Sequence, residues 1–442
     1  SFSLGLTLGR ENTHHHLRQA LPAFVEDHQL REALARCEVT IRADEAAGIE
    51  QAPGTTSAAV PTVSENEDAI AKVELSKSAG PLDGLRWFSR NGADGVFMGA
   101  AGVPIRYRLF PTYSPEEEGG KLRPGVVLLT GLMESMVKYG ETIAYLNNRG
   151  FSVYTYDHHG QGLSGRLPIP DGADPTVAHI TDFDHYVHDL VQFSKIVLPA
   201  SVPLYLHSDD KNAAGRGGSG SEGGGGGAAV AGVEGEHFSL PGESGGGDGE
   251  LLELSVIAHS MGGLIAVKAA LEEPLLFEGI VLAAPMLAPN TGKLSNTIVG
   301  AVAWIATKLA QGHSRSPIRR PARATMKWSR VTHDRRRLKL WEALRSEVGC
   351  VLQRGPSFAW LAQAVVASKR GRRRLGDLSV PVLVLEAGLD RLVRSDGIER
   401  FRRRVPQAMY RLFDGAYHDL FDETDDIRQE EVLRETCSFL EN

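Results

Sequence analysis

The chain has 442 residues, of which 42% are hydrophobic and 23% are charged, and its formal net charge is −7. These proportions are ordinary for a soluble globular protein, and the negative balance excludes a protein that binds polyanions through its bulk charge. The three cysteines, Cys37, Cys350 and Cys437, lie far apart in the sequence, which predicts free thiols in a reducing compartment rather than a disulfide framework.

The apolar runs of the chain predict no membrane span, because none reaches the ~18–20 residues that a spanning helix needs. The N-terminal stretch "SFSLGLTLGRENTHHH" lacks the basic start and the sustained apolar core of a secretory signal. The sequence begins with serine, so the removal of a leader stays an open alternative. We therefore expect a cytoplasmic protein.

The first part of the chain, residues 1–90, is weakly patterned and is predicted to be a partly flexible N-terminal extension with no assignable role. Its segment "EQAPGTTSAAVPTVSENEDA" combines Pro, Ser, Thr and acidic residues, a composition typical of flexible connections. Further on, "GVFMGAAGVPIRYRLF" (95–110) has two apolar runs around a glycine-containing turn, which predicts a β-hairpin.

From residue 125 onward, short apolar runs alternate with helical patterns. Continuous apolar runs of this length are typical of strands buried on both faces of a parallel sheet. They lie at 125–129, 151–156, 254–258, 280–284 and 380–387. The segment 182–197 places its apolar side chains on one helical face, with Asp182 as a candidate N-cap. The alternation predicts an α/β fold with a mostly parallel sheet and helices on both faces.

We expect the core of this fold at residues 91–285 and 375–442, with two insertions. Residues 211–249 are dominated by Gly, with Ser and Glu, and do not bury enough apolar surface to offset the entropy of ordering. This segment is predicted to be a disordered surface insertion. Residues 286–374 contain nineteen Lys and Arg but only three acidic residues. Helical patterns fill this segment, and in 294–310 one helical face is expected to carry Leu294, Ile298, Val302, Ile305 and Leu309. The whole segment is predicted to form a basic helical cap.

A serine stands where a strand pattern changes into a helix pattern, in "SVIAHSMGGLIAVKAA". A tight turn at this point lifts the side chain of Ser260 to the carboxyl edge of the sheet, and the helix N-terminus behind it favours developing negative charge. Such a turn needs small residues two positions before and two after the serine, and here these are Ala258 and Gly262. The pattern predicts a nucleophile elbow.

A serine nucleophile needs a general base that is oriented by a carboxylate. In α/β folds of this kind the chain order is Ser, acid, His, and both later residues follow strands. Asp390 follows the apolar run at 380–387, and His418 follows the strand-like "YRLF". We expect Asp390 and His418 to join Ser260 in one site. Asp396 and Asp414 are rival candidates for the acid, and Asp396 is better placed to cap a helix.

An oxyanion hole needs two backbone N–H donors. The residue after the nucleophile, Met261, offers one of them. The second is expected from the loop after the strand at 125–129, where Gly131 opens a turn and Leu132 presents its N–H. His158, His159 and His259 do not form a ligand cluster in the sequence, so we expect no metal and no cofactor.

The chain resembles a known family in segments that occur in a fixed order. These segments are "TGLMES", "YDHHGQGLSG", "DFDHYVHDL", "AHSMGGLIA", "GLDRLV" and "GAYHDLFDE". They are similar to the signature segments of the monoglyceride lipase and lysophospholipase branch of the α/β-hydrolases, which is also described as serine-aminopeptidase-like. The segments "VTHDRRRLKLWEAL" and "GPSFAWLAQA" look more like those of bacterial lysophospholipases. The resemblance covers about 95–440, apart from the glycine-rich insertion.

The resemblance implies a catalytic triad of Ser260, Asp390 and His418, with Leu132 and Met261 as oxyanion donors. In one position the chain departs from the family, which usually has His before the oxyanion glycine, whereas this chain has Thr130. That residue normally supports the loop, so the departure bears on the geometry of the oxyanion hole.

The expected function is hydrolysis of a carboxylic ester of a single-chain lipid, a lysophospholipid or a monoacylglycerol, through an acyl-enzyme. The basic cap favours anionic head groups or peripheral contact with an anionic membrane. Alternatives are an aminopeptidase or small-ester hydrolase of the same fold, and a non-catalytic hydrolase-fold module that binds membranes. A free-amine substrate would call for acidic residues near the pocket, and the cap has almost none. No nucleic-acid partner is expected, and the oligomeric state stays open.

Overall fold

The computed structural model describes residues 80–112, 125–171, 173–201, 253–289, 296–314, 331–347 and 355–441. The predicted disordered insertion at 211–249 and most of the predicted N-terminal extension lie outside these ranges. The described strands are β1 (Ala93–Met98), β2 (Pro104–Phe110), β3 (Gly125–Leu129), β4 (Ser152–Tyr156), β5 (Leu254–His259), β6 (Gly279–Ala283), β7 (Val382–Ala387) and β8 (Met409–Phe413). The predicted strands agree with these bounds to within two residues at either end.

The described strands form one eight-stranded sheet in the order β1-β2-β4-β3-β5-β6-β7-β8. The first two strands form the predicted hairpin, and β2 also runs antiparallel to β4. From β4 to β8 all neighbouring strands are parallel. The carboxyl ends of these parallel strands meet at one edge of the sheet, which is where loops of α/β folds carry their functional side chains.

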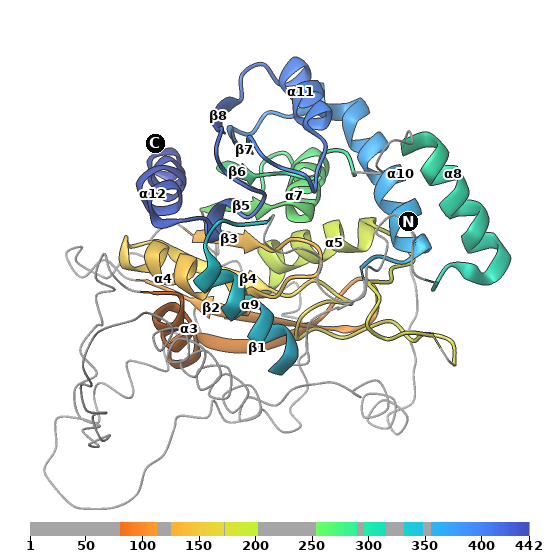
Figure 1. Ribbon diagram of the computed structural model, residues 1–442, viewed down its shortest axis with the longest axis horizontal. Coiled ribbons are helices and arrows are strands. Elements are labelled where there is room, and N and C mark those ends of the chain that lie inside the picture. Colours follow the sequence, from red (N-terminus) through yellow and green to blue (C-terminus); the bar gives the residue numbers. More distant parts are fainter. Residues whose placement is uncertain are drawn as a thin grey trace, which may run out of the picture.

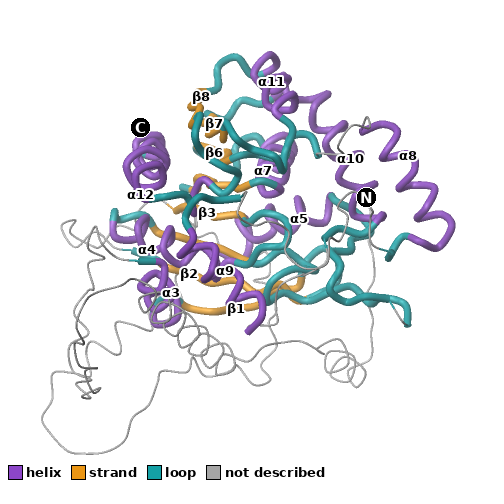
Figure 2. Tube along the Cα trace, in the orientation of Figure 1, coloured by secondary structure: helices purple, strands orange, loops and turns teal. Residues whose placement is uncertain are grey.

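Helices cover both faces of the sheet (Figures 1 and 2). Their bounds are α3 (Pro81–Arg90), α4 (Gly140–Asn148), α5 (Asp184–Gln192), α7 (Met261–Glu272), α8 (Asn296–Ala306), α9 (Arg335–Glu347), α10 (Phe358–Arg374), α11 (Ser395–Arg404), α12 (Asp425–Ile427) and α13 (Arg434–Leu440). Short helical turns are η1 (Met136–Tyr139), η2 (Phe193–Val197), η4 (Thr307–Gln311), η6 (Leu375–Asp377), η7 (Leu420–Asp422) and η8 (Arg428–Leu433).

The two sheet faces bury separate hydrophobic cores, because successive strand side chains point to opposite faces. Val127 and Leu129 of β3 belong to the core under α5, α7, α8, α10 and α11, whereas Val126 and Leu128 belong to the core under α3, α4, α9 and α13. The predicted apolar face of 182–197 is buried in the first core. The N-cap of α5 is Phe183 and not the predicted Asp182, whose carboxylate accepts a hydrogen bond from the N–H of Asp184 at 3.0 Å where the helix begins.

Helix α3 extends the packed core before residue 91, where the sequence predicted its start. Phe88 of this helix is fully buried, and its ring stands against that of Phe110 on β2. Gly84 lies so close to α4 that a Cβ there would be 2.5 Å from the Cα of Glu141. The residues from Pro81 onward therefore pack on the sheet core and are not part of a separate extension.

Within the described residues, the helices of the basic segment 286–374 pack at two different cores. Helices α8 and α10 pack on each other, and α10 also packs on α7, whereas α9 packs on α3 at the other core (Figure 1). No helix within the described ranges is both long and apolar enough to cross a membrane.

Candidate active site

Ser260 lies in the predicted sharp turn between β5 and α7, with backbone angles φ 52° and ψ −111°. A positive φ is strained for a residue other than glycine, and such strain needs support from the surrounding backbone. The N–H of Ser260 donates to the carbonyl of Ala283 at 3.0 Å, and its own carbonyl accepts from the N–H of Met286 at 2.7 Å. Strand β6 and the loop after it therefore fix the elbow on the sheet.

The small residues around Ser260 are required by close backbone contacts. A Cβ on Gly262 would lie 2.9 Å from the Cβ of Leu129 and 3.0 Å from the carbonyl oxygens of Leu129 and Thr130. Ala258 is fully buried in β5, opposite Leu129 of β3. The predicted elbow geometry is present, and Gly262 brings α7 against the strand that leads into the oxyanion loop.

The two other predicted catalytic side chains are hydrogen-bonded to each other: His418 Nδ1 lies 2.6 Å from Asp390 Oδ2. The second carboxylate oxygen of Asp390 accepts from the N–H groups of Leu392 at 2.7 Å and Val393 at 3.1 Å. Burial raises the pKa of Asp390, but the charge and hydrogen bond of His418 more than offset this and hold the pKa below its usual value. The rival acid Asp396 instead pairs with Arg394 at the start of α11.

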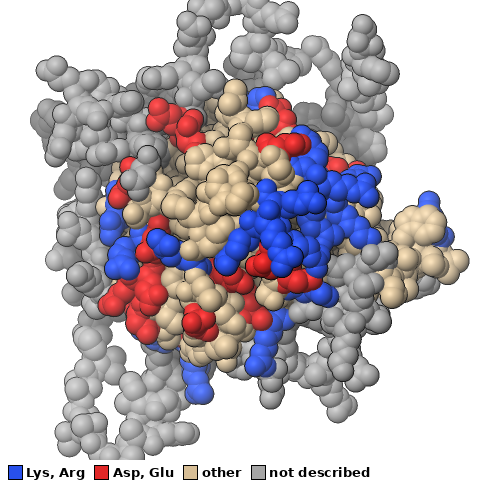
Figure 3. Space-filling view, turned by 90° about the horizontal axis from the view of Figure 1, so that it is seen from above, with Lys and Arg blue, Asp and Glu red and all other residues tan. Residues whose placement is uncertain are grey.

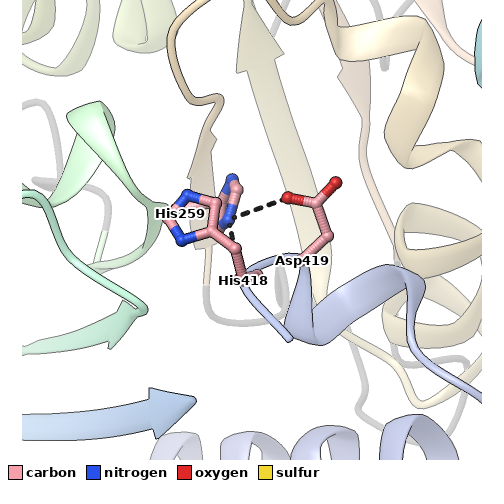
Figure 4. A group of neighbouring side chains, drawn as sticks. All are labelled: His259, His418 and Asp419. Atoms are coloured by element: carbon pink, nitrogen blue, oxygen red, sulfur yellow. Dashed lines mark hydrogen bonds and ion pairs between the residues drawn. The ribbon is translucent and has the colours of Figure 1, made fainter. Parts of the chain in front are cut away.

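His259, which precedes Ser260, connects the elbow with the histidine loop (Figure 4). Its Nε2 lies 3.3 Å from the carbonyl oxygen of His418 and 3.5 Å from Oδ1 of Asp419, and the rings of His259 and His418 are 4.8 Å apart between centroids. The structure thus brings Ser260, His418 and Asp390 to the same edge of the sheet. Ser260 and His418 are both largely buried.

The expected oxyanion donors have free N–H groups. Within the described residues, the N–H groups of Leu132 and Met261 donate to no protein acceptor. The loop is held by its neighbours, since Gly131 N–H donates to Glu134 Oε2 at 2.6 Å and Met133 N–H donates to Gln161 Oε1 at 2.5 Å. This arrangement leaves the two expected donors available to a substrate oxygen.

Thr130 does not support the oxyanion loop through its side chain, because its hydroxyl has no hydrogen-bond partner within the described residues. The support comes from His158, whose Nε2 lies 3.2 Å from the Thr130 carbonyl. Burial lowers the pKa of His158 to about 4, so the ring is neutral and donates through Nε2. Sequence reasoning assigned no such role to His158, Gln161 or Glu134; the only signal was the glycine-rich "YDHHGQG" after a strand.

The histidines near the site are engaged in hydrogen bonds and ion pairs. His159 Nδ1 bonds Asp189 at 3.0 Å, with both side chains fully buried. His259, His418 and Asp419 offer ligand atoms within 4.8 Å of one another, the spacing of a metal site. Both ring nitrogens of His259 already face protein acceptors, and Asp419 Oδ2 binds Lys138 at 3.0 Å. We interpret this cluster as a network that positions the site.

Comparisons of the sequence identify a family and several similar proteins. The family model described as serine aminopeptidase, S33, matches residues 120–207 and 247–425. Lysophospholipase L2 of Escherichia coli K12 is 25% identical over 366 residues, which cover 79% of this chain and 87% of that protein. Human monoglyceride lipase is 26% identical over 178 residues, covering 40% of this chain and 54% of that protein.

A solved structure shares the fold. A soluble variant of monoglyceride lipase from Saccharomyces cerevisiae, in complex with a substrate analog, superposes with a TM-score of 0.50 at 18% identity. The superposition covers 79% of this chain and 94% of that one.

Proposed function

Because this chain belongs to the serine aminopeptidase S33 family of α/β-hydrolases, we propose that it is a serine carboxylic-ester hydrolase with Ser260, His418 and Asp390 as its triad. The observation that carries the proposal is the 2.6 Å bond between His418 and Asp390 at the sheet edge where Ser260 occupies a strained elbow. A non-glycine residue held at φ 52° at the end of a central strand is what a nucleophile elbow requires.

The geometry supports hydrolysis in two steps through an acyl-enzyme. His418 accepts the proton of Ser260 as the hydroxyl oxygen attacks the ester carbonyl, and Asp390 holds the imidazole and stabilises its positive charge. The N–H groups of Leu132 and Met261 stabilise the tetrahedral oxyanion. Collapse of this intermediate expels the alcohol, which takes the proton from His418. Water then attacks the acyl-enzyme by the same route and releases the acid.

The substrate we propose is a single-chain lipid ester, a lysophospholipid or a monoacylglycerol. The relatives that support it are the lysophospholipase and the monoglyceride lipase named above. An aminopeptidase is less well supported, because the segment 286–374 has nineteen basic residues and only three acidic ones to attract a free amine.

A covalent label tests the proposal. Ser260→Ala is expected to abolish labelling by a fluorophosphonate and to lower kcat for a monoacylglycerol by about 10⁴ or more. The matched control is Ser194→Ala, because Ser194 is also buried and its hydroxyl has no partner within the described residues. A panel of monoacylglycerol, lysophosphatidylcholine, lysophosphatidic acid and an aminoacyl amide identifies the head group. Labelling that survives in Ser260→Ala would contradict the assignment.

We further propose that α8 and the end of α10 make a peripheral contact with an anionic membrane. The sequence predicted one apolar face for 294–310, and this face is turned to solvent: the exposed fractions are 54% for Ile298, 54% for Val302, 50% for Ile305 and 69% for Leu309. Trp304 is also 58% exposed. Apolar side chains of this kind bind a bilayer interface when basic residues flank them.

Basic side chains are exposed on the helix that packs against α8. Arg370, Arg373 and Arg374 are exposed at the end of α10, which packs on α8. Figure 3 shows Lys and Arg gathered on the side of the molecule where α10 and α11 lie in Figure 1. By contrast, Arg337 of α9 is only 2% exposed and pairs with Glu141 at 2.7 Å, so its charge is used inside the protein. The proposed contact comprises α8 and α10, whereas α9 packs at the other core.

A further inference from the structure

Lys138, in the turn η1 after the oxyanion loop, is a buried cation surrounded by carboxylates. Its side chain is 4% exposed, and its Nζ lies 2.6 Å from Glu134, 3.0 Å from Asp419 and 3.1 Å from Asp422. Burial lowers the pKa of Lys138, but the charges of Asp419 and Glu134 more than offset this and hold the pKa well above its usual value. Lys138 therefore carries a permanent charge inside the protein.

The carboxylates of this cluster touch each of the three segments that carry the reaction. Glu134 Oε2 accepts the N–H of Gly131, which precedes Leu132 in the oxyanion loop, at 2.6 Å. The same oxygen lies 3.1 Å from Nδ1 of His259, the residue before Ser260. Asp419 directly follows His418 in the chain.

Two further contacts close the cluster. Tyr139 donates its hydroxyl hydrogen to Glu134 at 2.7 Å, and its oxygen lies 2.9 Å from His259 Nδ1. Asp419 Oδ1 lies 3.5 Å from His259 Nε2, while its Oδ2 binds Lys138. Loops that are far apart in the sequence are thus fixed to one ammonium group.

A buried ionic cluster of this kind is a poor source of stability, because the desolvation of its charges offsets most of their attraction. Such a cluster instead fixes the relative positions of its members, because each is held by directional bonds in a region of low dielectric. We propose that Lys138 is a positioning residue, which holds Glu134 and Asp419 so that the oxyanion loop and His418 keep their places relative to Ser260. This inference rests on the proposed hydrolase function.

The test compares Lys138→Met with Lys268→Met. Lys268 of α7 is also a buried, paired lysine: its side chain is 8% exposed and its Nζ lies 3.0 Å from Asp184. Rates are measured per fluorophosphonate-reactive site and well below the melting temperature, so that unfolded enzyme does not count. For Lys138→Met we expect kcat to fall about 10²-fold with KM nearly unchanged, because misplaced donors act on the transition state. For Lys268→Met we expect kcat within twofold of wild type.

An alkyl trifluoromethyl ketone, which forms a tetrahedral adduct with the serine, reports on oxyanion geometry directly. Its inhibition constant should rise in Lys138→Met by about the factor by which kcat/KM falls, and should not change in Lys268→Met. If Lys138 has a purely structural role, the melting temperature falls in both variants, while the inhibition constant and kcat/KM stay at their wild-type values. That result would overturn the proposal.

A second variant keeps the inference testable if Lys138→Met does not fold. Glu134→Gln keeps the size of the side chain and an oxygen for Gly131 N–H, but it removes the charge that binds Lys138 and faces His259. For Glu134→Gln we expect kcat to fall and the inhibition constant of the ketone to rise, each by about tenfold. Wild-type values of both in this variant would contradict the proposal. If the wild-type protein neither labels nor hydrolyses esters, the proposed function fails; if it does both and the variants match it, only the role of Lys138 fails.

Discussion

Individual residues at the sheet edge combine a strained backbone with an ordered hydrogen-bond chain. Ser260 is held at φ 52° by backbone bonds to Ala283 and Met286, so these bonds fix the direction in which its side chain leaves the backbone. Asp390 receives two backbone N–H bonds besides that of His418, which fixes the carboxylate before any substrate arrives. These residues are pre-organised in the free protein, as serine hydrolysis requires.

The acid of the triad gives a test at a single residue. Asp390→Asn is expected to lower kcat by about 10⁴ while KM changes little, because the amide holds His418 in the wrong tautomer. The control is Asp396→Asn, which removes a carboxylate of the same size that pairs with Arg394 rather than with His418. Both variants should keep the fold, which circular dichroism checks. Equal activities of the two variants would remove Asp390 from the triad.

Sequence reasoning identified the residues that follow one another in a motif and missed those that meet only in space. Ser260, Asp390 and His418 each follow a strand pattern, so the order of elements was enough to predict their approach. Lys138 follows no strand pattern, and His158 follows one but has its partner elsewhere: the partners are Asp419 for Lys138 and the Thr130 carbonyl for His158. Their roles depend on burial and on distances that the sequence does not state.

At the scale of elements, the site depends on how closely α7 packs on the strand before the oxyanion loop. Gly262 allows this close packing, because a Cβ at this position would lie only 3.0 Å from the carbonyl oxygens of Leu129 and Thr130. The same helix starts at Met261, so its position sets both the proposed nucleophile and one proposed oxyanion donor. A shift of α7 would therefore displace both groups together.

Gly262→Ala tests this packing. The added Cβ would lie 3.0 Å from two backbone carbonyl oxygens, which do not move away as a flexible side chain would. We expect a loss of about 1–3 kcal/mol in the free energy of unfolding, as for other overpacked sites, and a fall in kcat of about 10²-fold. Gly376→Ala is the matched control, because a Cβ there meets no atom within 4 Å. Unchanged melting temperature and kcat in Gly262→Ala would show that the elbow tolerates a wider separation.

The orientation of α8 shows what the sequence predicts and what it leaves open. The period of the apolar residues correctly placed Ile298, Val302, Ile305 and Leu309 on one face of a helix. Apolar faces usually turn inward, and here Val299 and Ala303 are buried instead. Only the packing of α8 on α10 decides which face is covered, and that packing involves residues more than fifty positions apart in the chain.

At the scale of the whole molecule, Lys and Arg gather on one part of the surface (Figure 3). Helices α8, α10 and α11 cover one core, whereas α3, α4 and α13 cover the other. The net charge of −7 therefore conceals a basic surface on the first side (Figure 3). An anionic surface would attract the molecule by this side despite its overall negative charge.

Vesicle binding tests the proposed membrane contact. Affinity for anionic vesicles should fall with added salt, and it should fall further when Arg372, Arg373 and Arg374 are replaced by Gln. At about 1 kcal/mol for each arginine near the surface, the loss amounts to as much as about 100-fold. The control replaces Arg90, Arg149 and Arg434, which are exposed on elements of the other core. Equal binding to neutral and anionic vesicles, or equal losses in both variants, would exclude the contact.

The separate attachment of α9 determines how this enzyme can be redesigned. Arg337 joins α9 to Glu141 of α4 and to Asp425 of α12 through buried or partly buried ion pairs, so this helix belongs to the scaffold. Helix α8 has only its Val299 and Ala303 side inserted in the core. A chimera that exchanges 296–314 for the matching part of a relative should therefore keep its scaffold and change its preference for membrane surfaces. A graft of all of 286–374 would instead remove Arg337 and with it the ion pairs that join α4 and α12.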